Sequence, residues 1–184
     1  MLNRCWHLCA IGLVLLFAVP TLAQTPPPKP GPEHKKLEIW VGDWAVEAQV
    51  YATPLGPAGS VKGKASAKPV FGGFFVEWRS EVTGPTGTTQ WVETDGYDPV
   101  AQKFFFNQYA SDGGLLTGAY TIEGNTQSMS GTVISGGKQA KWRGTVVFAP
   151  DMMSAVEKNE ISLDGMTWMP WSEGRWTKAK PSPR

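Results

Sequence analysis

The chain from residue 43 onward is a succession of short runs in which apolar and polar residues alternate, separated by Gly, Pro, Asn and Asp turn residues. Helical periodicity never runs long enough to join two parallel strands, so the pattern excludes a parallel α/β fold. An antiparallel meander of this length must close or stack to protect its edges. We therefore predict an all-β, antiparallel up-and-down barrel of about ten strands, with a β-sandwich as the alternative. The expected strands are 43–52, 61–71, 74–82, 88–96, 103–110, 115–122, 126–134, 139–148, 155–163 and 166–178.

The residues before the strands predict export. Arg4 supplies a basic start, residues 10–19 are apolar, and small residues end the segment at Ala23. This is the pattern of a secretory signal peptide, residues 1–23, cleaved after Ala23. The apolar run is roughly half the length that spans a bilayer, so no membrane anchor is expected after cleavage. We expect a secreted, periplasmic protein with a Pro-rich linker (24–32), one barrel domain (33–179) and a disordered tail (180–184).

Composition narrows the partners of the mature domain. Both cysteines, Cys5 and Cys9, lie in the signal peptide, so no disulfide is expected. The signal peptide also takes one of the 17 basic residues, which leaves 16 against 16 acidic residues and a net charge of zero. A neutral domain lacks the electrostatic footprint of a nucleic-acid or anionic-membrane binder.

The first strand follows a short helix, predicted over residues 33–41. Gly42 suits the left-handed conformation that closes a helix. After it, the period of the apolar residues changes from helical to two, beginning with Trp44 and Val46. We expect Leu37, Trp40 and Val41 to form a plug over one end of the barrel.

The sequence Gly42-Asp43-Trp44 behind this helix resembles the Gly-x-Trp opening of the calycin barrels, the lipocalins and their relatives. In those proteins the Trp lies at the closed end of the barrel and packs against a basic residue of the last strand. The resemblance assigns that role to Arg175, so that Gly42, Trp44 and Arg175 close the barrel, with a cation–π contact between Trp44 and Arg175.

A second resemblance covers nearly the whole mature domain. The stretches Leu37 to Trp44, Phe71 to Glu77, Gly96 to Pro99, and Ile161 to Gly165 with Trp168 resemble a bacterial family known as domain of unknown function 1579. This resemblance implies a lipocalin-like barrel and implies no activity.

Cofactor chemistry lacks the residues it needs. Some small calycin-type barrels hold haem through an internal His, but the mature chain has one His, His34, in the helix before the barrel. The mature sequence has no Cys, no paired His and no carboxylates at metal-ligand spacing, and it lacks the parts of a Ser-His-Asp triad. We expect no cofactor, no metal site and no enzymatic activity.

The fourth strand leaves two interpretations open. Trp91, Glu93 and Asp95 share one face, and Gln90, Val92 and Thr94 share the other. If Trp91 points inward, Glu93 and Asp95 line the cavity, where burial would raise the pKa of a carboxyl and make it a general base or a polar anchor. If Val92 points inward or a bulge resets the register, both acids are surface groups.

The expected function is non-covalent binding of a small apolar or amphipathic ligand in the barrel. Two alternatives stay open: an enzyme that uses Glu93 or Asp95 for proton transfer, and a structural or partner-binding barrel with a filled interior. Outward aromatic residues Phe75, Phe105 and Tyr109 favour the last. The sequence leaves ligand and oligomeric state open. The candidate cavity-lining residues are Val46, Val76, Trp78, Trp91, Glu93, Phe104, Phe106, Gln108 and Trp142.

Overall fold

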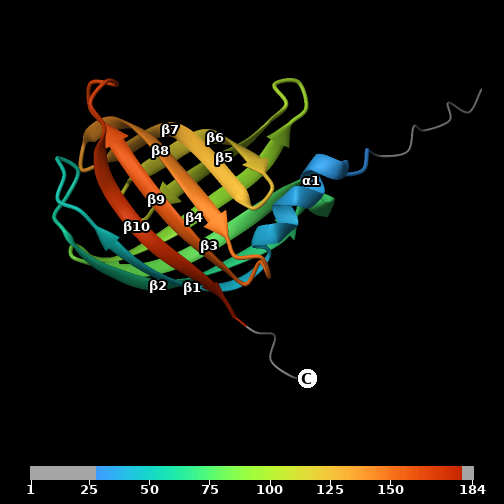
Figure 1. Ribbon diagram of the computed structural model, residues 1–184, viewed down its shortest axis with the longest axis horizontal. Helices are drawn as coiled ribbons and strands as arrows, with labels where there is room; N and C mark the ends of the chain where they lie inside the picture. Colours follow the sequence, from blue (N-terminus) through green and yellow to red (C-terminus); the bar gives the residue numbers. More distant parts are fainter. Residues whose placement is uncertain (1–27, 180–184) are drawn as a thin grey trace, which may run out of the picture.

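Ten antiparallel strands close into one barrel in the computed structural model, which describes residues 28–179 (Figure 1). Each strand pairs with the next along the chain, and β10 pairs with β1. The predicted up-and-down barrel is confirmed and the sandwich is wrong. The strands are β1 (Gly42–Val50), β2 (Gly59–Val70), β3 (Phe75–Gly84), β4 (Gly87–Asp98), β5 (Lys103–Ala110), β6 (Leu115–Glu123), β7 (Thr126–Ser135), β8 (Lys138–Phe148), β9 (Ser154–Ser162) and β10 (Met169–Lys178).

The predicted signal peptide, most of the predicted linker and the C-terminal tail lie outside the described residues. Within them, no helix is long and apolar enough to cross a membrane. A 3-10 helix, η2 (Phe71–Gly73), joins β2 to β3.

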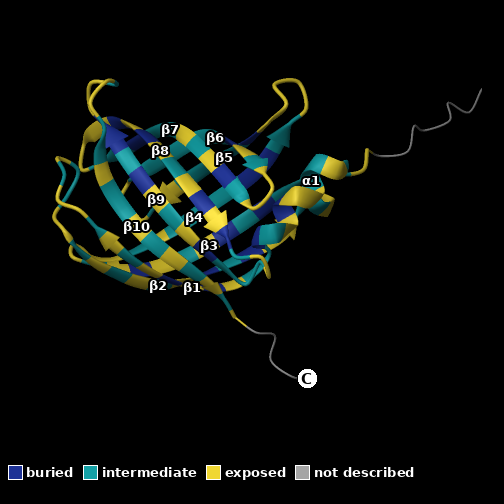
Figure 2. Cartoon of the chain, viewed as in Figure 1, coloured by how far each residue is buried: buried dark blue, intermediate teal, exposed yellow. Residues whose placement is uncertain are grey.

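Alternation along the strands separates the inside of the barrel from the outside. Trp44 and Val46 of β1 are buried, whereas Ala45 and Glu47 between them are exposed. Figure 2 shows the same exchange of exposed and less exposed residues along the other strands. Because side chains of a strand point to opposite faces in turn, one register decides which residues enter the barrel.

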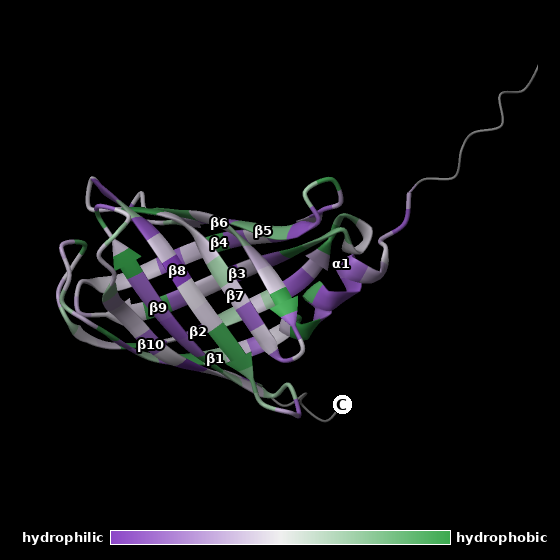
Figure 3. Cartoon of the chain, turned by 45° about the horizontal axis from the view of Figure 1, so that its top comes forward, coloured by the Kyte–Doolittle hydropathy of each residue, from purple (hydrophilic) through white to green (hydrophobic). Residues whose placement is uncertain are grey.

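A two-part helical plug covers one end of the barrel. It consists of α1 (Pro32–Lys36) and the 3-10 helix η1 (Leu37–Trp40). The single helix predicted over 33–41 is therefore divided in two, and it begins and ends one residue earlier. α1 is hydrophilic and contains no buried residue (Figure 3). η1 supplies the apolar contacts, because Leu37 and Trp40 are both buried.

Trp40 is the centre of this plug. Its ring lies 4.6–5.8 Å, between centroids, from four aromatic rings at the barrel end: Trp44, Trp78, Phe148 and Trp176. Its indole N–H donates to Oε1 of Gln127 on β7 at 2.9 Å. One side chain thus ties the plug to strands on opposite sides of the barrel.

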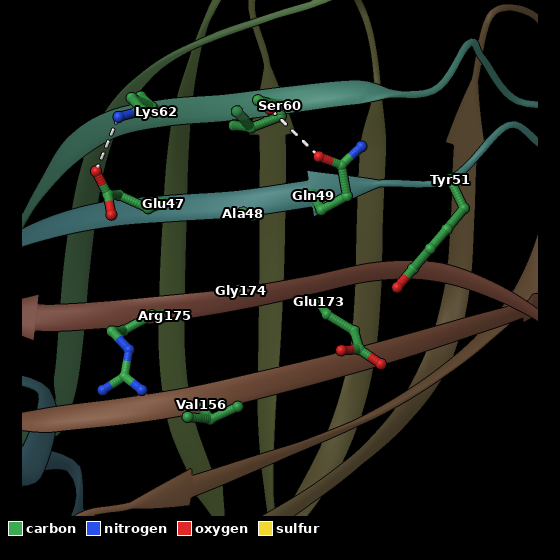
Figure 4. A pocket seen from close by; sticks show the side chains of 11 residues that line it. Glu47, Ala48, Gln49, Tyr51, Ser60, Lys62, Val156, Glu173, Gly174 and Arg175 are labelled. Atoms are coloured by element: carbon green, nitrogen blue, oxygen red, sulfur yellow. Dashed lines mark hydrogen bonds and ion pairs between the residues drawn. The ribbon is translucent and has the colours of Figure 1, made fainter.

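The predicted closure of this end by Arg175 is wrong. Arg175 pairs in register with Glu47 and is exposed on the outer face, where Figure 4 shows both side chains. Lys178 lies directly opposite Trp44 in the register, and its Nζ lies 5.2 Å from the centroid of the Trp44 ring. Arg175 is three residues from Lys178, an odd number, and therefore points to the other face of β10.

Gly42 is the first residue of β1 and not the end of the helix. Its φ of +131° favours glycine. A Cβ built there would lie 2.8 Å from Cε of Lys178. The absence of a side chain at Gly42 thus leaves room for the Lys178 stem, while Nζ of Lys178 donates to the Ile39 carbonyl at 3.3 Å.

Candidate functional site

The structure places the predicted cavity-lining residues inside the barrel. Six of them are buried and belong to the hydrophobic core: Val46, Val76, Trp78, Phe104, Phe106 and Trp142. The other three keep partial exposure, although they share the inward faces of β4 and β5: Trp91, Glu93 and Gln108.

Partly exposed inward-facing side chains occur along the whole length of the barrel. Leu116 at the start of β6 and Trp171 near the start of β10 pack against the core but are only partly buried, as is Glu157 in β9. Close to the plug, Trp44 and Phe148 are almost completely buried. Trp176 beside the plug is partly exposed and Ile161 toward the other end is buried, so solvent contact with inward-facing side chains is not confined to one end of the barrel.

The inward interpretation of the fourth strand is confirmed. Glu93 pairs with the inward-facing Trp78, and Asp95 pairs with Val76. Asp95 is only 4% exposed, and one of its carboxylate oxygens accepts the Trp78 indole N–H at 2.7 Å. No register shift occurs between β3 and β4, so both acids remain on the face of Trp91.

A third interior carboxylate, Glu157, was missed in the sequence. It lies on β9, and four strands separate β9 from β4 in either direction around the barrel, so Glu157 and Glu93 belong to opposite walls. Glu157 accepts the Trp176 indole N–H at 2.8 Å. The signal was available, because Ala155 and Ile161 are apolar and share its face of the predicted strand.

Burial favours the protonated form of these carboxyls. Burial raises the pKa of Asp95 from 3.8 to about 7, while the Trp78 N–H and the nearby Tyr120 hydroxyl act in the opposite direction. Burial raises the pKa of Glu93 well above its ordinary value, and the charges of Asp95 and Glu157 add to the effect.

Glu157 follows the same rule. Burial raises its pKa, and hydrogen bonding by Trp176 and Asn159 partly offsets the rise. All the groups that stabilise the three carboxylates are thus neutral donors: indole, hydroxyl and amide groups. Within residues 28–179 no Lys or Arg side chain takes part.

Three buried polar atoms in the barrel lack a hydrogen-bond partner among the described residues. They are the Tyr120 hydroxyl, Nε1 of Trp142 and Oδ1 of Asn159. Buried polar atoms are nearly always satisfied, so each of these requires an explanation. The Tyr120 hydroxyl lies close enough to Asp95 to influence its pKa but outside the geometry of a hydrogen bond.

Comparison with known families identifies the domain. The model of the family described as "Protein of unknown function (DUF1579)" matches residues 29–180, most of the chain. The chain belongs to the DUF1579 family. No curated protein sequence matches it significantly.

Solved structures confirm the barrel of this DUF1579 protein. The crystal structure of Rv2717c from M. tuberculosis is similar with a TM-score of 0.60 and 10% identity, over 82% of this chain and 99% of that one. The S-type phycobiliprotein lyase CPES from Guillardia theta is similar with a TM-score of 0.54 and 12% identity, over 82% and 94% of the two chains. At these identities the similarity establishes the calycin-like fold.

The outer wall of the DUF1579 barrel offers a weaker site. A shallow groove of about 480 Å³ runs over β1, β2, β9 and β10 (Figure 4). Its ion pair, Lys62 Nζ to Glu47 Oε1 at 3.1 Å, joins two exposed side chains, and exposed pairs stabilise a protein little. None of the three unpartnered buried atoms belongs to a residue that lines this groove.

The predicted outward aromatic residues do lie on the outer face. Phe75 and Phe105 are partly buried, with ring centroids 6.3 Å apart on either side of Gly96, and Tyr109 is 58% exposed. Phe71 of η2 extends this patch and is 78% exposed.

His34 and metal ligation were the remaining expectations. His34 lies in α1, where its ring packs edge-on against Phe74 and Tyr97 and its Nδ1 accepts the Gly31 N–H at 3.1 Å. Within residues 28–179 no three His, Cys, Asp or Glu side chains are arranged to hold a metal ion.

Proposed function

We propose that this DUF1579 protein is a secreted, periplasmic binding protein that holds a small amphipathic molecule non-covalently inside the barrel. One observation carries the proposal: inward-facing apolar and polar side chains beyond the plug keep contact with solvent, as Trp91 and Gln108 do. A site lined by aromatic side chains with a few polar groups is the usual form of a small-molecule pocket.

Native mass spectrometry of the mature protein, purified gently from its own periplasm, tests the proposal. An adduct that survives native spraying and disappears on denaturation supports it and gives the mass of the ligand. A bare polypeptide mass contradicts it and favours a filled barrel.

Two neighbouring residues of β5 supply a matched pair of variants. Gln108→Trp adds bulk to a partly exposed inward position, whereas Tyr109→Trp adds a similar ring on the outer face. We expect the first to lose the adduct and the second to retain it, with circular dichroism as the check that both fold. Retention of the adduct by both variants would place the ligand outside the barrel.

Proton transfer is the second candidate, because Asp95 is buried without a basic partner and has a pKa of about 7. A general base works best when its pKa lies near the working pH. Incubation of the recovered ligand with the protein in D₂O distinguishes the two functions. Deuterium incorporation that Asp95→Asn abolishes would support an enzyme, and a ligand of unchanged mass would support binding alone.

A further inference from the structure

Three carboxylates inside the barrel have no cation to neutralise them. Glu93 and Asp95 lie on one wall and Glu157 on the opposite wall, and the charges of Asp95 and Glu157 both act on Glu93. Two of the three are fixed by indole N–H groups: Asp95 by Trp78 at 2.7 Å and Glu157 by Trp176 at 2.8 Å. A buried charge without a counter-charge is costly, so proteins rarely keep one without a use.

Nearly all basic residues of the strands lie on the outer face of the barrel. Every Lys and Arg on the ten strands is exposed except Lys178. Lys178 is engaged at the plug end by the Trp44 ring and the Ile39 carbonyl. The described strands therefore present acidic groups and no free basic group to the interior.

A second observation is independent of the acids. The Asn159 side chain is 8% exposed, and its Nδ2 donates to Oγ of Ser172 at 2.9 Å, yet its Oδ1 accepts nothing among the described residues. Asn159 lies two residues from Glu157 on the same inward face and also stabilises that carboxylate. Oδ1 lies over Gly144 of β8 and is an acceptor without a protein donor.

The opposite wall repeats this arrangement. The Tyr120 hydroxyl is buried and lies beside Asp95, whose pKa it lowers as a donor, so its oxygen is the part that lacks a partner among the described residues. A hydroxyl oxygen can also accept a hydrogen bond. Acceptors without a protein donor therefore flank the acids on both walls.

We propose that the molecule held in the barrel carries a positively charged nitrogen, a protonated or quaternary amine on an apolar body, and that its cation lies between Glu93 and Glu157. The inference rests on the proposed binding function and specifies its ligand class. The indoles of Trp78 and Trp176, with ring centroids 5.8 Å apart, present their N–H edges to Asp95 and Glu157 and hold these carboxylates in place. The carboxylates are not gathered as a metal would require, which favours an extended organic cation.

Protons compete with such a cation for the same carboxylates. The groups that face one another are Glu93, Asp95, Tyr120 and Glu157, with no basic side chain among them. Deprotonation of Glu93 and Glu157 creates the site, and burial raises the pKa of both, so amine binding should tighten as the pH rises. Asp95, with a pKa of about 7, adds its negative charge near Glu93 above that pH.

Calorimetry with three probes of similar shape tests whether the site prefers a positively charged ligand. The probes are 2-phenylethylamine, 2-phenylethanol and 3-phenylpropionate, which carry a positive, zero and negative charge. At pH 8 we expect the amine to bind the wild-type protein at least about tenfold more tightly than the alcohol, a difference of about 1.4 kcal/mol, and the carboxylate to bind most weakly.

Amide variants locate the effect. Glu93→Gln and Glu157→Gln should each weaken amine binding about tenfold and leave the affinity for the alcohol within about twofold. Glu47→Gln, on the outer face of β1, is the control and should change neither affinity.

The outcomes separate this inference from the proposed function. Equal binding of amine and alcohol, or no effect of Glu93→Gln, overturns the inference and leaves a binding barrel. A neutral or anionic native adduct does the same. Absence of binding by all three probes together with a bare native mass overturns both.

Discussion

Two separate structural effects favour glycine at position 42, and variants can measure the contribution of each to stability. Its φ of +131° strains any L-residue, and a Cβ would displace Lys178 from beside Trp44. We expect Gly42→Ala to lower the free energy of unfolding by about 2–3 kcal/mol, measured by urea denaturation.

The matched control is Gly87→Ala. Gly87 has a φ of +109°, but no atom lies within 4 Å of the Cβ that would be added. This variant should show the backbone strain alone, about 1–2 kcal/mol. Equal losses in the two variants would mean that the contact with Lys178 contributes nothing.

Asp95 should make the stability of the barrel fall as the pH rises. Its pKa is 3.8 in an unfolded chain and about 7 in the barrel. Below 3.8 both states hold the proton, so there is no penalty. Between 3.8 and about 7 only the folded state holds it, and the free energy of unfolding falls by about 1.4 kcal/mol per pH unit; above about 7 the penalty is constant.

Asp95→Asn removes this titration, and its amide oxygen still accepts the Trp78 N–H. We expect the variant to be more stable than wild type by about 2 kcal/mol or more at pH 8, and similar to it near pH 4. Urea denaturation across the pH range measures the difference, with Asp43→Asn on the outer face as the control. Parallel pH profiles for Asp95→Asn and wild type would contradict the expectation.

For single residues, the sequence predicted which side chains share a face of a strand better than it predicted which side chains contact one another. Alternation alone places Trp91, Glu93 and Asp95 together, and β4 keeps them so because no bulge interrupts its pairing with β3. Which face is inward depends on the curvature of the whole sheet, which a single strand does not encode. The choice of Arg175 failed because it rested on the resemblance to the calycin barrels and did not test the two-residue period of β10, which places Lys178 opposite Trp44.

At the scale of elements, the plug is held by one side chain. Trp40 packs against four rings and donates to Gln127. Trp40→Ala should cost about 3–5 kcal/mol, because it leaves a cavity and an unpaired amide oxygen. Trp40→Phe keeps an aromatic ring and should cost less.

Trp168→Ala supplies the comparison. The guanidinium of Arg143 lies over the ring of Trp168, with Cζ of Arg143 4.2 Å from the ring centroid. Trp168 is partly exposed. Its loss should cost about 0.5–1 kcal/mol, as an exposed cation–π contact does. If thermal and urea denaturation show the same loss for Trp40→Ala, the plug does not stabilise the barrel.

The positions of the strands were predictable because residues that favour turns, such as Asn125 and Gly136, separate one strand from the next. The start of β10 was not. Residues 166–168 were assigned to the strand, but β10 begins at Met169. The Asp164 carboxylate accepts the N–H groups of Met166 and Thr167 at 2.8 and 2.7 Å, and these bonds replace strand pairing.

At the scale of the whole molecule, the chain segregates charge: every described strand cation except Lys178 is exposed, and three of its acids are inside. A neutral net charge conceals this arrangement, because composition counts charges without placing them. An interior that retains acids at the expense of stability is expected where a function requires them. The fold alone does not require them, since amides would supply acceptors to the same indole donors.

The combined variant Glu93→Gln, Asp95→Asn, Glu157→Gln therefore distinguishes a structural from a functional role. We expect it to be more stable than wild type at pH 8 and nearly indifferent to pH, because burial raises the pKa of all three carboxyls in the folded state. Saturating 2-phenylethylamine should stabilise wild type by about 2.7 kcal/mol at 100 times its dissociation constant, and the variant hardly at all. Thermal unfolding with and without the amine measures both effects. A variant less stable than wild type at pH 8 would mean that the acids serve the packing of the barrel, and the case for a cationic ligand would lose its energetic basis.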